Sequence, residues 1–220
     1  MAGGGRARED ESGLSMKRLF ALTLTGMIAM NANAQTKSFD TDKAGALPAG
    51  WVAGVTGRGS PSWTTEADPT APSKPNVLKQ SGSGTFPWCV LGGVSMADGS
   101  VETRFKPVSG KEDQAGGVVW RWKDGDHYYV ARANALENNV SLYYTEKGSR
   151  KTIKYVDAPV AGNTWHHLKV EFSGTRIKVI LDGKAYIEVE DTHIAGAGSV
   201  GVWTNADSVT LFDDFTFGGK

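Results

Sequence analysis

Short runs in which apolar and polar residues alternate make up most of the chain from Asn76 onward, and Gly, Asp, Asn and Ser separate these runs. Alternation with a period of two places successive side chains on opposite faces of a β-strand. No stretch from Asn76 onward shows a capped 3.6-residue period long enough for a helix. The pattern therefore predicts an all-β domain, in which two antiparallel sheets pack as a sandwich or jelly roll.

Strands are predicted where the alternation is clearest, at 101–106, 115–123, 126–134, 139–144, 168–172, 177–181, 187–189, 199–204 and 209–217. The charged residues Lys169, Glu171 and Lys178 alternate with apolar ones, which is typical of a sheet with one solvated face. The region 43–73 is rich in Gly, Pro, Ser and Thr, and we expect long surface loops with short strand pieces there.

The segment Gln114–Asn139 is the most informative one, because it is predicted to form a β-hairpin with two contrasting faces. Its turn is expected at Asp124-Gly125, since this dipeptide accepts the positive φ angles of a type I′ turn. That register puts Trp120 and Trp122 together on an apolar face, which is expected to join the core. A shift of one residue would exchange the two faces, so the interpretation depends on the turn.

The other face of this hairpin gathers polar and aromatic side chains that suit a sugar ligand. Aromatic rings pack on the C–H faces of sugar rings, while guanidinium and amide groups hydrogen-bond to hydroxyl and carboxylate oxygens. The predicted ligand-binding set, with two residues from the next strand, is Arg121, Tyr128, Arg132, Asn134, Asn139 and Tyr143. The alternative is an exposed face on which the arginines bind nothing and lay their aliphatic stems over Val119 and Val130.

Trp203 belongs to the predicted ligand-binding set under one of two open interpretations. It lies on a short strand with Ser199 and Gly201 on its own face. We expect it either to fill the core or to form an exposed stacking platform, with 203–207 at the edge of the same site.

Charge and cysteine content narrow the classes of function. The chain has 24 Lys and Arg against 24 Asp and Glu, and removal of the four basic and three acidic residues of segment 1–34 leaves 20 against 21. A nearly neutral chain without basic clusters lacks the electrostatic footprint of a nucleic-acid binder or a lipid-surface patch. Cys89 is the only cysteine, so an intramolecular disulfide is impossible and stability must come from packing.

The beginning of the chain is predicted to be a secretory signal peptide, 16–34. A basic start at 16–18 precedes an apolar run at 19–30 and an A-x-A cleavage signal that ends at Ala34. The apolar run is too short to span a membrane, which takes about 20 residues. We expect residues 1–15 to lie upstream of the true translation start, and the mature domain 35–220 to be exported to the periplasm or the cell exterior.

Several motifs are similar to those of the concanavalin A-like lectin and glucanase superfamily, which includes laminin-G-like domains. The segments 164–170, TWHHLKV, and 179–183, VILDG, resemble two strands of these jelly rolls. The segments 116–121, GGVVWR, and 209–214, VTLFDD, are similar to bacterial secreted 3-keto-disaccharide hydrolase domains, loosely called family 16 glycoside hydrolases. The resemblance covers 39–217 and implies a single two-sheet jelly roll whose concave sheet meets glycans.

This superfamily contains glycosidases, lyases and lectins without catalysis, so the fold alone does not select a function. Family 16 glucanases carry a strand motif E-x-D-x-x-E, and this chain has none. We expect an exported carbohydrate-binding domain, with hydrolysis of a 3-keto-disaccharide-type glycoside implied by the resemblance. The alternatives are a non-catalytic adhesion or interaction module and, ranked last, a polysaccharide lyase. Enzymatic activity and oligomeric state stay open.

Catalytic and metal-binding candidates are few. A glycosidase needs two carboxyl groups that flank the scissile bond, and Glu137 is the one acid or base candidate beside the polar face, with a structural role as the alternative. Related sandwiches hold a structural calcium between the first and last strands, which here suggests Asp40 and Asp213 as ligands. Calcium takes six to eight oxygens, and no other cofactor is expected.

Overall fold

The computed structural model describes residues 1, 4 and 34–219, and this part of the chain contains strands and turns but no helix. Apart from residues 1, 4 and 34, the predicted upstream extension and signal peptide lie outside the described residues. No helix within the described ranges has the length and apolar character needed to cross a membrane. The strands are β1 (Gln35–Lys37), β2 (Trp51–Ser60), β3 (Trp63–Ala67), β4 (Asn76–Gln80), β5 (Ser83–Leu91), β6 (Gly99–Ser109), β7 (Ala115–Asp124), β8 (His127–Asn134), β9 (Asn139–Glu146), β10 (Ser149–Asp157), β11 (His166–Ser173), β12 (Arg176–Leu181), β13 (Lys184–Glu190), β14 (Ser199–Trp203) and β15 (Val209–Gly219).

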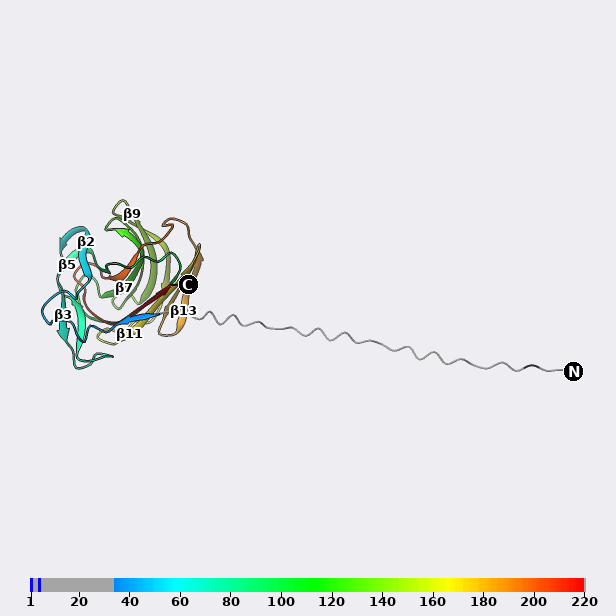
Figure 1. The fold of residues 1–220 in the computed structure, drawn as a ribbon, viewed down its shortest axis with the longest axis horizontal. Coiled ribbons are helices and arrows are strands. Elements are labelled where there is room, and N and C mark those ends of the chain that lie inside the picture. Colours follow the sequence, from blue (N-terminus) through cyan, green and yellow to red (C-terminus); the bar gives the residue numbers. More distant parts are fainter. Residues whose placement is uncertain (2–3, 5–33, 220) are drawn as a thin grey trace. The chain divides into compact units, whose positions relative to one another are not determined.

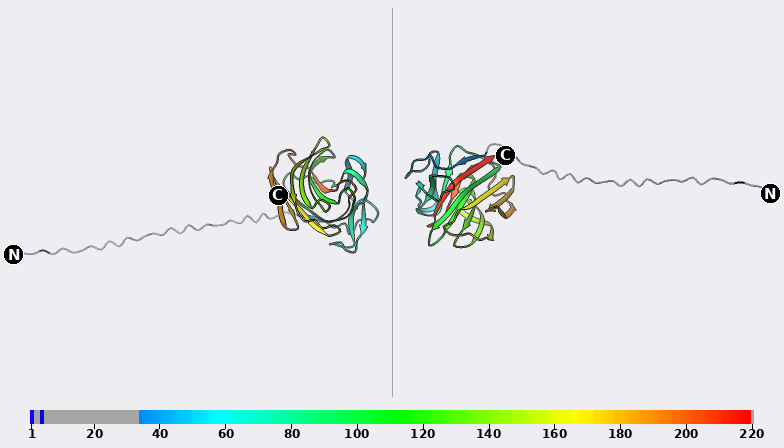
Figure 2. Two further views of the ribbon diagram at one scale, coloured as in Figure 1. Left: turned by 180° about the vertical axis from the view of Figure 1, so that it is seen from behind. Right: turned by 90° about the horizontal axis from the view of Figure 1, so that it is seen from below.

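The strands form two antiparallel sheets, which confirms the predicted β-sandwich. One sheet has eight strands in the order β13-β12-β11-β6-β15-β4-β3, with β1 also paired to β15. The other has seven strands in the order β10-β9-β8-β7-β14-β5-β2. Figure 1 shows β2, β5, β7 and β9 of the seven-stranded sheet above β3, β11 and β13 of the other, and Figure 2 shows the same layers from behind and from below.

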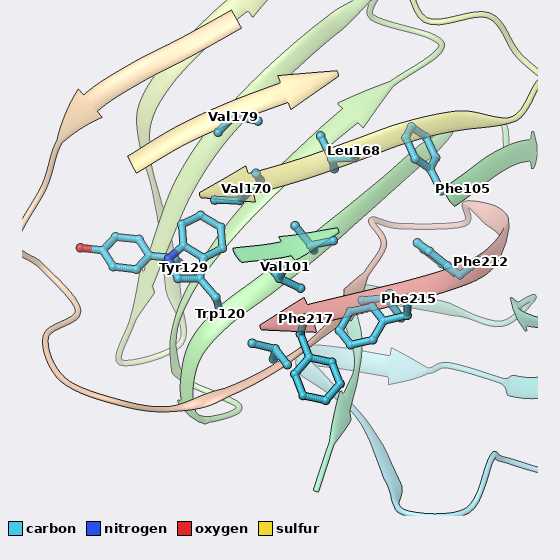
Figure 3. Packing of buried hydrophobic residues seen from close by; sticks show 14 of the residues in the cluster. Val101, Phe105, Trp120, Tyr129, Leu168, Val170, Val179, Phe212, Phe215 and Phe217 are labelled. Atoms are coloured by element: carbon cyan, nitrogen blue, oxygen red, sulfur yellow. The ribbon is translucent and has the colours of Figure 1, made fainter. Parts of the chain in front are cut away.

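The main core lies between the two sheets and is rich in aromatic rings. Trp120 of β7 stacks on Tyr129 of β8 and on Phe172 of β11, with ring centres 5.3 and 5.9 Å apart. Figure 3 shows Trp120 beside Val170 of the opposite sheet, with Tyr129 next to Trp120 and Leu168 farther along β11. Each of these residues comes from the apolar set of an alternating strand, because alternation sends that set to one face.

The predicted strands are all present, and the structure adds strands to which the sequence assigned no bounds, among them β1, β4 and β5. The region 43–73, predicted as loops with short strand pieces, contains the ten-residue strand β2 as well as β3. The edge strand β10, which the sequence reading missed, is highly charged and has a register shift between Thr152 and Lys154. Because the shift interrupts the alternation of side chains along β10, a search for a period of two does not detect this strand.

The β7–β8 hairpin forms, but the prediction of its tip was wrong. Pairing follows the expected register through Trp120 and Tyr129, and then Asp124 pairs with His127, so three residues of β7 face one residue of β8. The extra residues form a bulge that begins at Arg121, where φ is 47°. Beyond the bulge the faces are exchanged, and for this reason Trp122 packs on the face opposite to the one predicted.

The seven-stranded sheet is strongly curled, as contacts between distant strands show. Four strand spacings of about 4.8 Å would separate β2 from β8 by about 19 Å in a flat sheet. Instead, the hydroxyls of Thr56 on β2 and Tyr128 on β8 are hydrogen-bonded at 2.8 Å. Likewise, the Arg150 guanidinium of β10 lies 4.4 Å from the ring centre of Phe86 on β5. The face turned away from the other sheet is therefore concave, and we call it the trough.

Candidate functional site

The floor of the trough is a second apolar cluster, separate from the main core. Its buried members are Trp88, Val90, Val119, Tyr128, Val130, Tyr143 and Trp203. One end of the trough is filled, because the indole of Trp88 packs against Trp122 with ring centres 5.1 Å apart. Thr56 adds a hydrogen bond to the carbonyl of Gly125 at this end. Polar side chains gather at the opposite end, which we call the polar end.

A buried ion pair forms the base of the polar end. The Arg132 guanidinium donates through Nη1 to both carboxylate oxygens of Asp113, at 3.2 and 3.0 Å, and the two side chains are only 3% and 4% exposed. The amides of Asn134 and Asn205 also donate to this carboxylate, as does the backbone N–H of Gln114 at 3.0 Å. Since both carboxylate oxygens of Asp113 accept hydrogen bonds from more than one donor, the buried negative charge is compensated.

The loop that carries Asp113 is held by a second carboxylate. Asp207 accepts the backbone N–H groups of Lys111, Glu112 and Asp113 at 2.7, 3.0 and 3.1 Å. These backbone hydrogen bonds keep the pKa of Asp207 below its ordinary value. Asp207 is therefore ionised at neutral pH, and it fixes the position from which Asp113 reaches the trough.

Glu137 extends the polar end toward the edge strand β10. Its Oε2 accepts Nη2 of Arg132 at 2.7 Å and Nδ2 of Asn139 at 2.6 Å, while 44% of the side chain stays exposed. Burial acts to raise the pKa of Glu137, but the hydrogen bond from Asn139 and the Arg132 charge outweigh it, so the pKa is lowered. Nδ2 of Asn139 also donates to the Tyr155 hydroxyl at 2.7 Å.

Arg150 crosses the trough above its aromatic floor. The centre of its guanidinium lies 4.4 Å from the ring centres of both Phe86 and Tyr143 and 5.6 Å from that of Trp203. Burial lowers the pKa of this guanidinium from its usual value. Its Nη1 atom is out of contact with solvent and has no hydrogen-bond partner among residues 34–219. A buried donor left in this way is costly unless a water or a ligand satisfies it.

A cavity of about 420 Å³ opens beside Phe86, the ring on which Arg150 stacks, at the polar end. It is bounded by Phe86 of β5, by Arg58 of β2, and by Glu112 and Asn205 on two loops. Cavities of this size accommodate small ligands. The lining offers an aromatic ring, a guanidinium, a carboxylate and an amide, which together can contact both the C–H face and the hydroxyls of a sugar.

The structure brings six of the seven predicted ligand-binding residues to the trough. They are Tyr128, Arg132, Asn134, Asn139, Tyr143 and Trp203. Most of them support the site from below, because Tyr128, Asn134, Asn139 and Trp203 have no exposed surface. Trp203 stacks under Phe86 with ring centres 5.8 Å apart, so it is neither part of the main core nor an exposed platform.

Arg121 was expected on the same face as Arg132, and this expectation was wrong. The bulge turns its side chain away from the trough, where it donates to the carbonyls of Ala97, Gly174 and Ile194 at 3.0, 2.7 and 3.1 Å. The guanidinium is buried and joins three loops at the rim of the sandwich. Arg121 is therefore a structural residue of the fold.

The two calcium candidates bind backbone and side-chain donors of the protein itself. Asp40 accepts the backbone N–H of Asn76 at 3.0 Å. Asp213 accepts the backbone N–H and the hydroxyl of Ser73, both at 2.8 Å, and burial raises the pKa of Asp213 to about 6. Within the described ranges no three acidic, His or Cys side chains are grouped as a metal site would require. The calcium site stays a prediction.

Sequence reasoning missed Asp113, Arg150, Tyr155 and Phe86. Asp113 lies in a loop, and its role arises only when that loop is placed over β8. Arg150 and Tyr155 share the trough face of β10, where the register shift obscures the alternation that would have revealed them. Phe86 comes from the far wall of the curled sheet. The one available signal was an edge segment, 149–157, that combines basic and aromatic residues.

A curated relative shares sequence with much of this chain. The levanase of Bacillus subtilis (strain 168) is 27% identical over 156 residues, which are 70% of this chain and 22% of the levanase. The chain thus matches about a fifth of the length of that enzyme. No family model matches the chain.

Solved structures share the fold. The carbohydrate-binding module CBM66 from Bacillus subtilis has a TM-score of 0.65 and 21% identity, over 80% of this chain and 99% of the module. Domain 4 of an extracellular arabinanase from Geobacillus stearothermophilus, in complex with arabinotriose, has a TM-score of 0.58 and 15% identity, over 85% and 93%. A β-glucanase of Bacillus licheniformis has a TM-score of 0.55 and 13% identity, over 86% and 99%. These similarities confirm the expected two-sheet jelly-roll fold.

Proposed function

We propose that the jelly-roll domain is a carbohydrate-binding module whose ligand occupies the polar end of the trough. The observation that carries this proposal is the state of Arg150, which is stacked on Phe86 and Tyr143 and has a buried Nη1 without a partner. The aromatic contacts hold the guanidinium plane in place, and its free N–H groups then suit the hydroxyl oxygens of a sugar in the adjacent cavity.

Binding rather than hydrolysis is what the carboxylates of the trough favour. Asp113 and Glu137 both pair with the same guanidinium, Arg132, so they are not free to flank a glycosidic bond. A general acid needs a raised pKa so that it keeps its proton near neutral pH. The pKa of Glu137 is instead lowered, which makes it an acceptor for sugar hydroxyls rather than a proton donor.

The relatives suggest which saccharides to test first. The curated relative is a levanase, and one structure with the same fold was solved with arabinotriose. Levan and arabino-oligosaccharides are therefore our first candidates for the ligand. Hydrolysis of a 3-keto-disaccharide, which the sequence resemblance implied, is the narrower alternative, and the same assay tests it.

Calorimetric titration of the mature domain 35–220 with levan oligosaccharides, arabinotriose and a 3-keto-disaccharide, with product analysis, tests the proposal. We expect binding without product. Arg150→Ala removes the proposed hydrogen bonds from the guanidinium to the sugar and should weaken binding about 10- to 100-fold. The matched control, Arg176→Ala, removes an arginine that is 84% exposed on the other sheet and should leave affinity unchanged. Equal affinities for both variants and wild type would overturn the proposed site.

The sequence of segment 16–34, which is typical of a secretory signal peptide, supports export of this module. We propose that the chain is cleaved after Ala34 and acts in the periplasm or outside the cell, where polysaccharides are met. N-terminal sequencing of protein recovered from the periplasm and the medium should begin at Gln35. Recovery of uncleaved chain from the cytoplasm alone would contradict the proposal.

A further inference from the structure

Among the aromatic side chains of residues 34–219, Tyr155 is the most exposed, with 49% of its surface accessible. It lies directly opposite Ser141 in the pairing of β10 with β9, and this register puts its ring on the trough face, as it does for Asn139. All other aromatic residues of the described chain are at least half buried or stacked in the two apolar clusters. An exposed ring beside a polar site therefore calls for an explanation.

The ring of Tyr155 is not a loosely held surface group. Its hydroxyl accepts a hydrogen bond from Nδ2 of Asn139 at 2.7 Å, and the same amide donates a second one to Glu137. Glu137 in turn accepts a hydrogen bond from Arg132. Asn139 is fully buried, and its own Oδ1 accepts the hydroxyl of Ser141 at 3.1 Å. A continuous chain of hydrogen bonds thus fixes Tyr155 to the buried ion pair at the base of the polar end. Such support from buried partners is how binding sites hold a side chain in one geometry.

Charge around this ring indicates the kind of ligand. Glu137 is ionised and half-exposed beside it, and Asp157, exposed, follows on the same face of β10. Two carboxylates attract sugar hydroxyls as hydrogen-bond donors and repel an acidic sugar. A tyrosine ring offers a flat apolar surface for the C–H face of a sugar.

Position along β10 indicates the size of the ligand. Arg150 pairs with Thr145 of β9 and Tyr155 pairs with Ser141, so four strand steps, or about 13 Å, separate the two positions. One sugar ring held against the Arg150 guanidinium therefore does not reach Tyr155. A saccharide that contacts both must continue across the polar end as a chain.

We propose that Tyr155, with Glu137 and Asn139, forms an outer subsite that stacks a second sugar residue, so that the module prefers uncharged oligosaccharides to monosaccharides. This inference rests on the proposed function, because it extends the same binding site. The subsite contributes by stacking on the ring, and Asn139 positions that ring through its hydroxyl.

The test is calorimetric titration of the mature domain with matched saccharides: arabinose against arabinotriose, fructose against a levan trisaccharide, and an acidic trigalacturonate. Wild type should bind one of the neutral trisaccharides at least about tenfold more tightly than its monosaccharide. Tyr155→Ala should remove about fivefold to tenfold of the trisaccharide affinity and leave monosaccharide affinity unchanged. Tyr155→Phe keeps the ring and should retain most of the trisaccharide affinity.

Tyr186→Ala, which removes an aromatic ring from β13 of the other sheet, is the matched control and should behave as wild type. If wild type binds monosaccharide and trisaccharide equally, or if Tyr155→Ala changes neither, the outer subsite is wrong while the module remains a sugar binder. If wild type binds trigalacturonate more tightly than both neutral trisaccharides, the preference for uncharged chains is wrong. Absence of binding to every saccharide overturns the proposed function itself.

Discussion

The guanidinium of Arg132 and the carboxylate of Asp113 form an ion pair, with Nη1 3.0 Å from Oδ2, that is almost completely enclosed by the curled sheet. The Asn134 amide donates to the same carboxylate, so two residues of β8 hold the loop before β7. The pair supports the polar end of the trough and also joins it to Glu137. Its loss should therefore affect both stability and the proposed ligand site.

Asp113→Ala should lower the free energy of unfolding by about 3 to 5 kcal/mol, because it leaves the Arg132 charge buried without its main partner. Urea denaturation followed by tryptophan fluorescence measures this change. The control is Glu188→Ala, which breaks an exposed pair with Lys178 at 2.9 Å and should cost less than about 1 kcal/mol. Similar small losses in both variants would show that the buried pair does not stabilise the fold.

Arg121→Ala should strongly reduce the melting temperature, since three loop carbonyls lose a buried donor. Arg121→Lys should fail to restore it, because one ammonium group cannot reproduce the planar guanidinium fork. Glycan affinity, measured by calorimetry on the folded fraction, should stay at the wild-type level. A loss of affinity with an unchanged melting temperature would return Arg121 to the ligand-binding set.

Asp213 should make the protein less stable as the pH rises from 4 to 7. Burial raises its pKa to about 6, so the fold favours the protonated carboxyl. Because the folded pKa exceeds the ordinary value of 3.8, this stability is complete below about pH 4 and is lost as the pH rises through 6. The loss is at most about 3 kcal/mol, at about 1.4 kcal/mol for each pH unit.

Asp213→Asn removes this titration while other carboxylates are unchanged. The difference in unfolding free energy between variant and wild type should shift in favour of the variant between pH 4 and pH 7, as measured by urea denaturation at each pH. Altered hydrogen bonds to Ser73 add only a constant offset. A difference that is flat with pH would mean that Asp213 is not the titrating group.

Gly54→Ala should disturb the filled end of the trough. A Cβ at this position would overlap the six-membered ring of the Trp88 indole. Overpacking of this kind costs about 1 to 3 kcal/mol, and it should also shift the tryptophan fluorescence of the native protein. Gly162→Ala is the control, because its Cβ would make only an ordinary contact of 3.4 Å with the end of the Gln114 side chain. Equal effects of the two substitutions would refute the packing argument.

The alternation of apolar and polar residues was sufficient to predict the β-sandwich and many of the residues that line the trough. Six paired positions of the β7–β8 hairpin, from Ala115 opposite Asn134 to Trp120 opposite Tyr129, follow the predicted register. That register carried Arg132 and Asn134 to the trough face. The prediction failed at Arg121, because a bulge adds residues to one strand without any change in the alternation of the sequence.

The sequence by itself determined the fold class and the chemical character of the hairpin, because a period of two is a local property of neighbouring residues. The tertiary structure alone decided which groups meet in the trough. Asp113 comes from a loop, Phe86 from the far wall of the sheet, and Arg150 and Tyr155 from an edge strand. Their proximity depends on how far the sheet curls, and curl is the sum of twists and bulges over seven strands, which no local pattern encodes.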